Sequence, residues 1–365
     1  MMSHVESRIY PDSALFARYI IHQKEMTLAY IRGWAAHGAK QKLEPFTYDS
    51  GRLDSEEVEI AVEYCGLCHS DLSILNNDWG LSRYPIIPGH EVVGRVVAAG
   101  DHVKGLQIGQ WVGVGWNARS CMHCHECMTG NNNLCLEAQP TIVGHYGGFS
   151  ERVRSHWIWA IPLPDMLDVS SAGPLLCGGV TVFAPLITHA VKPTDRVGIV
   201  GIGGLGHMAL QFVNAWGCEV TAFTSNPSKF EEVRKLGAHR VVSSRDGGEI
   251  LKAANSLDFL LVTVNMPLDW TALLKTLKPN GRMHVVGAVL EPMPIPAFEL
   301  IMGQKSISGS PTGGPTTISA MLDFAARHAL APQVEHFPMS KVNDAIEHLA
   351  AGKARYRVVL DADFA

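Results

Sequence analysis

Residues 196–212 read RVGIVGIGGLGHMALQF, and this stretch decides the fold of the second half of the chain. A short apolar run leads into the glycine pattern GIGGLG at 201–206, and an apolar, helix-like run follows it. In this strand–turn–helix setting, the G-x-G-x-x-G pattern is typical of a dinucleotide-binding loop whose helix N-terminus receives the pyrophosphate. We therefore expect the dinucleotide to be bound by Gly201, Gly203, Gly204, Leu205 and Gly206. The alternative is a glycine-rich turn that binds no ligand.

The sequence around this loop alternates between strand-like and helix-like stretches. Strand-like runs occur near 196–200, 218–223, 239–243, 257–263, 281–286 and 305–309. Helix-like stretches between them include 204–216, 227–236 and 269–277. Six strands with helical crossovers predict an α/β fold with a doubly wound, parallel Rossmann sheet over residues 171–309. Beyond it we expect helices at 315–329 and 341–351 and a last strand at Tyr356–Leu360.

The end of the second strand indicates which dinucleotide is bound. NAD-binding loops place an Asp or Glu about 20 residues after the glycines, where it holds the ribose 2′-hydroxyl. Here residues 224–229 contain no carboxylate and instead offer Thr224, Ser225 and the cation Lys229. This pattern favours NADP(H) over NAD. The alternative is that Ser225 or Asn226 only caps the next helix.

The first half of the chain is rich in strand patterns and poor in helix patterns. Residues 58–64 alternate apolar and polar side chains, and apolar runs at 92–98 and 109–114 are separated by glycines. With 365 residues we expect about two domains. The first 25 residues resemble nothing downstream, so we expect them to be an extension or a misassigned start before a first strand that begins at Met26.

Composition and charge narrow the class of protein. Hydrophobic residues make up 47% of the chain, which is typical of a packed globular protein, and the net charge of −5 argues against a nucleic-acid partner. No apolar run reaches the roughly 18–20 residues that span a bilayer, so we expect no membrane partner. The start carries no export signal, and we therefore expect a reducing, cytoplasmic location in which close cysteines bind metal rather than form disulfides.

A four-cysteine pattern gives the clearest metal signal. Its members are Cys121, Cys124, Cys127 and Cys135. Four thiolates this close in sequence predict a closed, tetrahedral, structural zinc site. Two alternatives are an iron–sulfur cluster and a site in which His123 or His125 replaces one thiolate. Zinc knuckles also bind nucleic acid, but the acidic charge argues against that here.

Three further segments carry good zinc ligands without forming a compact motif. They are CGLCHSD at 65–71, GHE at 89–91 and LCG at 176–178. The H-E-x-x-H pattern of zinc proteases fails, because Gly94 stands where the second histidine belongs. The G-x-S-x-G elbow and the P-loop are also missing, which argues against acyl transfer and nucleotide hydrolysis.

Taken in order, these motifs resemble those of the zinc-dependent medium-chain alcohol dehydrogenases, in the cinnamyl-alcohol-dehydrogenase-like branch with its bacterial NADPH-dependent aldehyde reductases. The resemblance extends from about Met26 to the C-terminus. It rests on the four-cysteine pattern and on CGLCHSD (65–71), GHEVVGRV (89–96), LLCGGVT (175–181), VGIVGIGGLGH (197–207) and KARYRVVLD (353–361). It implies a GroES-like β-barrel catalytic domain at 26–170, a Rossmann domain at 171–309 and a return to the first domain at 310–365.

The resemblance also implies the roles of the ligand-bearing segments. Cys68, His90 and Cys177 would ligate a catalytic zinc, with Glu91 as an exchanging fourth ligand and a second, structural zinc in the four-cysteine site. Three protein ligands and one open position suit a catalytic zinc, although either cysteine alone is better explained by buried packing. Asp71 is the natural partner for the second nitrogen of His90.

Further expectations concern the proton, the cofactor and the assembly. Ser70 resembles the hydroxyl relay of the family, but Ser73 replaces the histidine that many relatives use as the outer proton acceptor. His69 is expected at the cofactor pyrophosphate, or else on the surface. Segment 281–309 would pair subunits, which predicts a homodimer.

The predicted function is NADP(H)-dependent interconversion of primary alcohols and aldehydes, aromatic or of medium chain length. One alternative is a polyol or sugar dehydrogenase, which would need a polar pocket. This chain instead offers the apolar candidates Trp79, Trp116, Met293, Phe298 and Leu300. Another alternative is a non-catalytic, NADPH-binding zinc protein.

Overall fold

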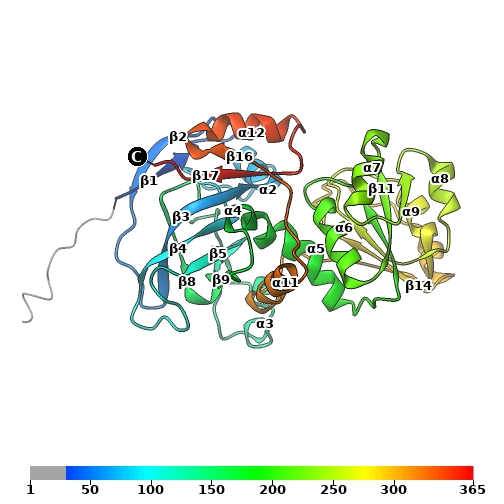
Figure 1. Cartoon of the computed structure of the whole chain (residues 1–365), viewed down its shortest axis with the longest axis horizontal. Coiled ribbons are helices and arrows are strands. Elements are labelled where there is room, and N and C mark those ends of the chain that lie inside the picture. Colours follow the sequence, from blue (N-terminus) through cyan, green and yellow to red (C-terminus); the bar gives the residue numbers. More distant parts are fainter. Residues whose placement is uncertain (1–29, 365) are drawn as a thin grey trace, which may run out of the picture.

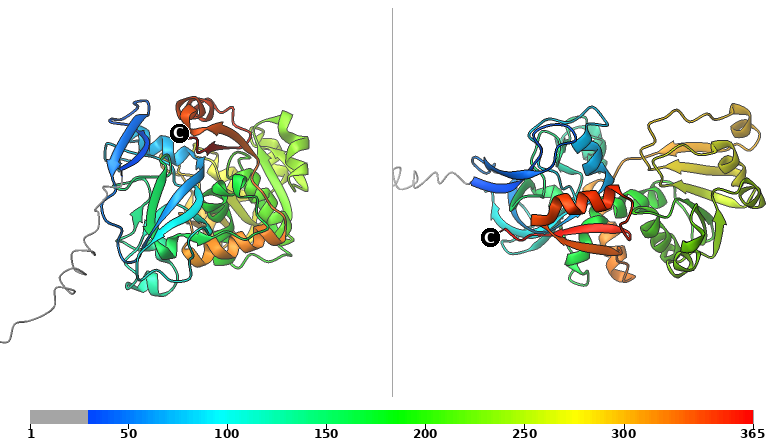
Figure 2. Two further views of the ribbon diagram at one scale, coloured as in Figure 1. Left: turned by 60° about the vertical axis from the view of Figure 1, so that its left-hand side comes forward. Right: turned by 90° about the horizontal axis from the view of Figure 1, so that it is seen from above.

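The computed structural model describes residues 30–364 and has two lobes side by side (Figure 1). One lobe combines the first half of the chain with its C-terminal segment, and the other contains the parallel sheet (Figure 2). The expected N-terminal extension, and Met26 itself, lie outside the described residues. The expected first strand is present from Tyr30, as β1 (Tyr30–Ala35).

The second lobe is built on the predicted parallel sheet. Its strand order is β12-β11-β10-β13-β14-β15, and every neighbouring pair is parallel. The strands are β10 (Arg196–Val200), β11 (Glu219–Thr224), β12 (Arg240–Ser243), β13 (Leu257–Val262), β14 (Leu277–Val285) and β15 (Ser306–Gly309). The helices are α6 (Gly206–Trp216), α7 (Phe230–Lys235), α8 (Gly247–Lys252), α9 (Trp270–Thr276) and α10 (Ala297–Ile301). This order confirms the doubly wound fold and puts β10, with its glycine loop, where the order reverses.

The first lobe is built on a seven-stranded sheet that curls into a barrel-like shape (Figure 1). Its strands are β3 (Glu57–Leu67), β4 (Val92–Ala99), β5 (Trp111–Val114), β8 (Arg152–His156), β9 (Ile161–Pro162), β16 (Val334–Pro338) and β17 (Arg357–Asp361). β17 pairs antiparallel with β3, with Val358 opposite Leu67. The C-terminal segment therefore completes the sheet that begins some 300 residues earlier in sequence.

Smaller elements flank this sheet. The strands β1 and β2 (Glu44–Asp49) form one hairpin, and β6 (Asn117–Arg119) pairs with β7 (Gln139–Pro140). The helices are α2 (His69–Asn76), α3 (His125–Met128), α4 (Val169–Ala172) and α12 (Val342–Ala350), with a short 3-10 turn at Gly173–Leu176.

The helix α5 (Gly178–Thr188) joins the lobes into one packed core. It packs against α6 of the second lobe and against α11 (Pro315–Arg327). Phe183 of α5 lies with its ring centroid 5.4 Å from those of both Phe212 and Phe324. This continuous apolar contact holds the glycine loop at a set position relative to the first lobe.

Within residues 30–364, no single helix is long and apolar enough to cross a membrane. Only the pair Val169–Leu176 and Gly178–Thr188 reaches that length and composition together, and it is bent by 55°.

Candidate functional site

The four residues expected at a catalytic metal converge. The ligand atoms of Cys68, His90, Glu91 and Cys177 all lie within 4.8 Å of one another. Cys68 is the N-cap of α2 at the end of β3, His90 and Glu91 directly precede β4, and Cys177 is the N-cap of α5. Three segments far apart in sequence thus bring two thiols, one imidazole and one carboxylate to a common point.

Asp71 orients this cluster, as expected of a partner to His90. Its fully buried carboxylate accepts hydrogen bonds at 2.9 Å from Nδ1 of His90 and from the backbone N–H groups of Gly89 and Cys68. His90 therefore turns Nε2 toward the thiols, and this buried nitrogen has no hydrogen-bond partner among the described residues. An imidazole that is anchored at one nitrogen and unpartnered at the other is oriented as a metal ligand.

Arg357 is a site residue that sequence reasoning missed. It lies buried at the start of β17, and its guanidinium is paired with Oε1 of Glu91. Oε2 of Glu91 has no hydrogen-bond partner among the described residues. Gly66 makes room for this oxygen, because a Cβ there would come within 1.9 Å of it. The only sequence signal for this pairing was the position of Arg357 directly before the apolar run Val358–Leu360.

The electrostatics of the cluster suit a cation. Burial raises the pKa of Glu91 to about 7, although Arg357 acts in the opposite direction. A hydrogen bond with Cys177 holds the pKa of the Cys68 thiol well below its usual value, although partial burial acts in the opposite direction. The same hydrogen bond, followed by burial, raises the pKa of Cys177. Without a metal, Cys68 and Cys177 share a proton through their hydrogen bond. A zinc ion that binds both sulfurs as thiolates, together with the unpartnered nitrogen of His90, fits this arrangement.

The residues expected around the cofactor and the proton differ in their exposure. Oγ of Ser70 lies 3.7 Å from Sγ of Cys68, and Ser70 is half-buried at the cluster. His69 is exposed, and Ser73 is half-buried on the same helix, α2. The position of Ser70 is compatible with a relay, while the roles of His69 and Ser73 stay predictions.

The four cysteines of the second pattern also converge, with their sulfurs within 4.8 Å of one another. Backbone N–H groups point at three of the sulfurs: Cys124 N–H donates to Cys121, Cys127 N–H to Cys124, and Cys121 N–H to Cys135. His123 is exposed, and its Nδ1 lies 2.8 Å from the carbonyl oxygen of Cys121. A four-sulfur site therefore fits better than one with His123, although Cys121, His123 and Glu137 also come within that distance.

The glycine loop has the geometry that a dinucleotide requires. Gly201 has φ of +89°, and a Cβ on Gly206 would come within 1.9 Å of the carbonyl oxygen of Gly201. Gly203 is exposed and has open space where its Cβ would be, which leaves its backbone accessible. A Cβ on Gly204 would meet the guanidinium of Arg357 at 3.0 Å, so the loop lies directly beside the arginine that pairs with Glu91.

A second residue that sequence reasoning missed is His207, in the first turn of α6. It is fully buried and has a ring nitrogen 3.2 Å from the carbonyl oxygen of Gly203. Its other nitrogen accepts a hydrogen bond from the backbone N–H of Gln333, and its ring stacks on Tyr356 at 4.8 Å. His207 thus ties the glycine loop to the C-terminal segment of the first lobe.

The end of β11 contains the residues expected at the ribose. Thr224 is buried and Ser225 exposed, and Nζ of Lys229 lies 3.4 Å from the carbonyl oxygen of Ile202 in the glycine loop. Asn226, rather than Ser225, caps the next helix, because Oδ1 of Asn226 accepts a hydrogen bond from the backbone N–H of Ser228. Ser225 is therefore not needed as a cap.

Two of the apolar candidates lie near the cluster around His90. The ring of Trp116 lies 5.0 Å from that of His90, and Trp79 lies 6.0 Å from Trp116. Of the other apolar candidates, Met293 and Leu300 pack against the core around β13 and β14, and Phe298 is 69% exposed on α10. Of these five candidates, Trp116 thus lies against a residue of the cluster, and Trp79 packs on Trp116.

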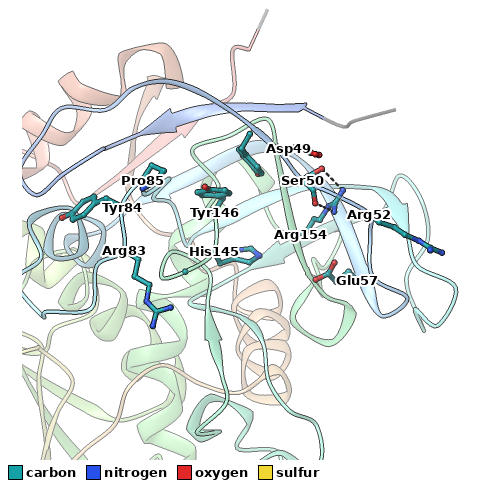
Figure 3. A pocket seen from close by; sticks show the side chains of 12 residues that line it. Asp49, Ser50, Arg52, Glu57, Arg83, Tyr84, Pro85, His145, Tyr146 and Arg154 are labelled. Atoms are coloured by element: carbon teal, nitrogen blue, oxygen red, sulfur yellow. Dashed lines mark hydrogen bonds between the residues drawn. The ribbon is translucent and has the colours of Figure 1, made fainter. Parts of the chain in front are cut away.

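A separate groove of about 480 Å³ lies on the first lobe (Figure 3). Its lining includes Tyr48, Arg83, His145, Tyr146 and Arg154, and none of its residues belongs to either cysteine cluster. It is therefore not the site assembled around His90.

Comparison with known proteins agrees with this arrangement. The chain matches the family models "Alcohol dehydrogenase GroES-like domain" over residues 54–165 and "Zinc-binding dehydrogenase" over residues 204–327. It is 53% identical to aldehyde reductase AdhA of Synechocystis sp. over 330 residues, which is 90% of this chain and 98% of that protein. It is 37% identical to probable cinnamyl alcohol dehydrogenase 6 of Oryza sativa subsp. japonica, over 91% of this chain and 95% of that one.

Two solved structures are similar over most of the chain. A cinnamyl alcohol dehydrogenase from Sorghum bicolor has a TM-score of 0.87 and 39% identity, covering 91% of this chain and 97% of that one. A cinnamyl alcohol dehydrogenase from Helicobacter pylori, solved in complex with NADP(H), has a TM-score of 0.84 and 28% identity over 91% and 98% of the two chains.

Proposed function

The chain belongs to the zinc-binding alcohol dehydrogenases, and we propose that it interconverts primary aromatic or medium-chain alcohols and aldehydes by hydride transfer with NADP(H). One observation carries this proposal. A cluster of two half-buried thiols and a buried, unpartnered imidazole nitrogen lies beside the arginine that also contacts a dinucleotide-type glycine loop. Hydride transfer needs the reacting atoms about 3–3.5 Å apart, so the substrate-binding cluster and the cofactor-binding loop must adjoin, as they do here.

Cys68, His90 and Cys177 would hold the catalytic zinc, with Glu91 as an exchanging fourth ligand. When bound there, zinc would act as a Lewis acid toward the substrate oxygen. Asp71 keeps the tautomer of His90 that presents Nε2 to the metal. Arg357 neutralises the buried carboxylate of Glu91.

Ser70 would carry the proton that accompanies hydride transfer. Its hydroxyl lies at the cluster, and it is half-buried between the thiol of Cys68 and the exposed start of α2. With Ser73 in place of the usual histidine, the proton continues from Ser70 to solvent or to another group.

The cofactor and the second metal complete the assignment. The glycine loop would bind the pyrophosphate, with His69 as a further contact, and Thr224, Ser225 and Lys229 would select NADP(H). A second zinc in the four-cysteine cluster would stabilise the lobe that contains α3. The thiolate clusters, which oxidation would dismantle, favour a reducing compartment such as the cytoplasm.

A homodimer is the proposed assembly. The strand β15 is at the edge of the six-stranded sheet, and the neighbouring helix α10 exposes apolar side chains. Phe298, Ile301 and Met302 are each more than two-thirds exposed, at 69%, 68% and 69%. A second copy that paired edge to edge would cover both features.

Neither alternative function gains support from the geometry. A polyol dehydrogenase would need hydrogen-bonding groups around its substrate, whereas here the indole ring of Trp116 lies against His90 and Trp79 packs on Trp116. A non-catalytic zinc protein would lack at least one ligand of the catalytic set, whereas all four converge here.

Two measurements on the purified protein test the proposal. We expect two zinc ions per chain by elemental analysis and NADPH oxidation with benzaldehyde or cinnamaldehyde. The zinc-loaded protein should also be tested with aliphatic aldehydes and sugars, with both NADPH and NADH. Absence of turnover with all of them would contradict catalysis and favour the non-catalytic, NADPH-binding zinc protein. Turnover of sugars alone would favour the polyol dehydrogenase.

A further inference from the structure

Two cations from different lobes meet at one buried aromatic ring. Nζ of Lys229, which follows β11, lies 4.9 Å from the ring centroid of Tyr356, and the guanidinium carbon of Arg355 lies 5.8 Å from it. Tyr356 is only 4% exposed, and it precedes β17 in the first lobe. The loop between α12 and β17 lies on the side of the first lobe that faces the Rossmann lobe (Figure 1).

The backbone contacts set the position of Arg355 firmly. Its N–H donates to the carboxylate of Glu335 at 2.8 Å, and the next N–H, that of Tyr356, donates to the carbonyl of Gln333 at 3.1 Å. The ring of Tyr356 also stacks on His207 of the Rossmann lobe, with the planes 11° apart. The segment carrying Arg355 is thus held against the glycine loop from both lobes.

The positive charges of Lys229 and Arg355 are only partly balanced by neighbouring carboxylates. Lys229 donates to the uncharged carbonyl of Ile202. Among residues 30–364, the structure gives the guanidinium of Arg355 one carboxylate partner, the partly exposed Glu232 at 3.4 Å, while Glu335 accepts only the backbone N–H of Arg355. Burial lowers the pKa of Lys229, and the nearby Arg355 lowers it further, although Glu232 acts in the opposite direction. Such a pair would be stabilised by an anion placed between the two cations.

The location indicates which anion this would be. Lys229 contacts the glycine loop, and Thr224, at the end of β11, marks the ribose end of a bound dinucleotide. An arginine near that strand end accommodates the 2′-phosphate in NADP-binding Rossmann folds, because its planar fork of donors matches phosphate oxygens. Arg355 supplies this arginine from outside the Rossmann lobe.

We propose that Arg355 is a specificity-determining residue that binds the 2′-phosphate of NADP(H) together with Lys229. This inference rests on the proposed NADP(H) dependence and adds a residue from the first lobe to it. The phosphate would bridge the two lobes. The competing carboxylate of Glu232 would be displaced from Arg355 as the cofactor binds.

Calorimetric titration of the full-length, zinc-loaded protein with adenosine 2′,5′-bisphosphate and with 5′-AMP tests the inference without relying on turnover. Arg355→Ala should weaken binding of the bisphosphate about tenfold and that of 5′-AMP less than about twofold. Arg355→Lys should restore part of the loss, and the thermal melt of each variant verifies that it is folded. Arg234→Ala, a matched charge removal on α7 where Arg234 pairs with Glu231, should change neither affinity.

Two further variants separate the possible failures. Glu232→Gln should tighten bisphosphate binding about two- to threefold, because it frees Arg355. If Lys229→Ala abolishes the preference for the bisphosphate and Arg355→Ala leaves it intact, the inference is wrong and the NADP(H) assignment stands. If the unmodified protein binds the bisphosphate no better than 5′-AMP, the NADP(H) assignment itself fails, and the inference fails with it. Equal weakening of both ligands by Arg355→Ala would also overturn the inference.

Discussion

The two cysteine clusters bring together the same kind of ligands in opposite ways. The four-cysteine cluster comes from one stretch, Cys121–Cys135, and three of its sulfurs accept N–H groups from the same stretch. The cluster around His90 comes from the end of β3, the end of the 3-10 turn Gly173–Leu176 and the segment before β4, and it is held by Asp71 and by the distant Arg357. One cluster is a product of local chain geometry, and the other exists only when the whole first lobe is folded.

This difference has a consequence for stability. A local cluster can gather its metal in a partly folded chain, so its metal contributes directly to folding. A distributed cluster adds a buried ion pair, Glu91 with Arg357, whose desolvation cost must be met by the surrounding fold. Loss of metal should therefore affect stability at the local cluster and activity at the distributed one.

The largest expected effect is at the distributed cluster. Cys177→Ser removes one of three protein ligands, and we expect kcat/KM for cinnamaldehyde to fall by about 1000-fold, because several kcal/mol of Lewis-acid stabilisation are lost. The melting temperature should change little. The matched control is Cys218→Ser, a buried cysteine outside both clusters. Retained activity in the Cys177 variant would remove this residue from the metal site.

The converse change is Cys124→Ser in the local cluster. We expect this variant to lose about one zinc per chain and about 3 kcal/mol of stability, or roughly 4 °C in melting temperature for a chain of this size. Activity per folded molecule should be affected far less than by Cys177→Ser. Scanning calorimetry with zinc analysis measures the effect, and an unchanged melt would show that the cluster has no structural role.

A smaller effect is expected from the residue that orients His90. Asp71→Asn keeps the shape of the side chain but replaces one of its two oxygens by an NH₂ group. Both oxygens of Asp71 accept hydrogen bonds from N–H donors, so the NH₂ group would face a donor. We expect zinc affinity and activity to fall by about 10–100-fold, the usual effect of losing such a partner. Competition with a chelator measures the affinity, and Asp78→Asn, exposed just beyond α2, is the control. Equal chelator sensitivity of the two variants would argue against an orienting role for Asp71.

The smallest effect is expected at the cofactor. Lys229→Ala should raise KM for NADPH about tenfold and leave KM for NADH within about twofold, since only the former carries a 2′-phosphate. Lys235→Ala, an exposed charge removal on α7, serves as the control. A similar rise for both nicotinamides would assign Lys229 a general structural role.

The parts of the fold that depend on short-range patterns were predictable. The predicted strand at 196–200 is β10, and the other five strands occur within a few residues of their expected positions. The largest boundary difference is at β14, which begins at Leu277 rather than 281 and so shortens the predicted helix at 269–277. Backbone pairing with β13 at Leu257 accounts for the earlier start, and no local pattern encodes such a partner.

Local spacing was sufficient for the four-cysteine cluster, the glycine loop and the alternation of strands and helices, because each depends on neighbours a few residues apart. The pairing of Glu91 with Arg357, the contact of His207 with Gln333 and the approach of Arg355 to Lys229 depend on chain segments more than 100 residues apart. Such contacts form only when the C-terminal segment closes the first sheet against the Rossmann lobe. Their energies come from burial and from charges meeting at that junction, which a one-dimensional pattern does not contain.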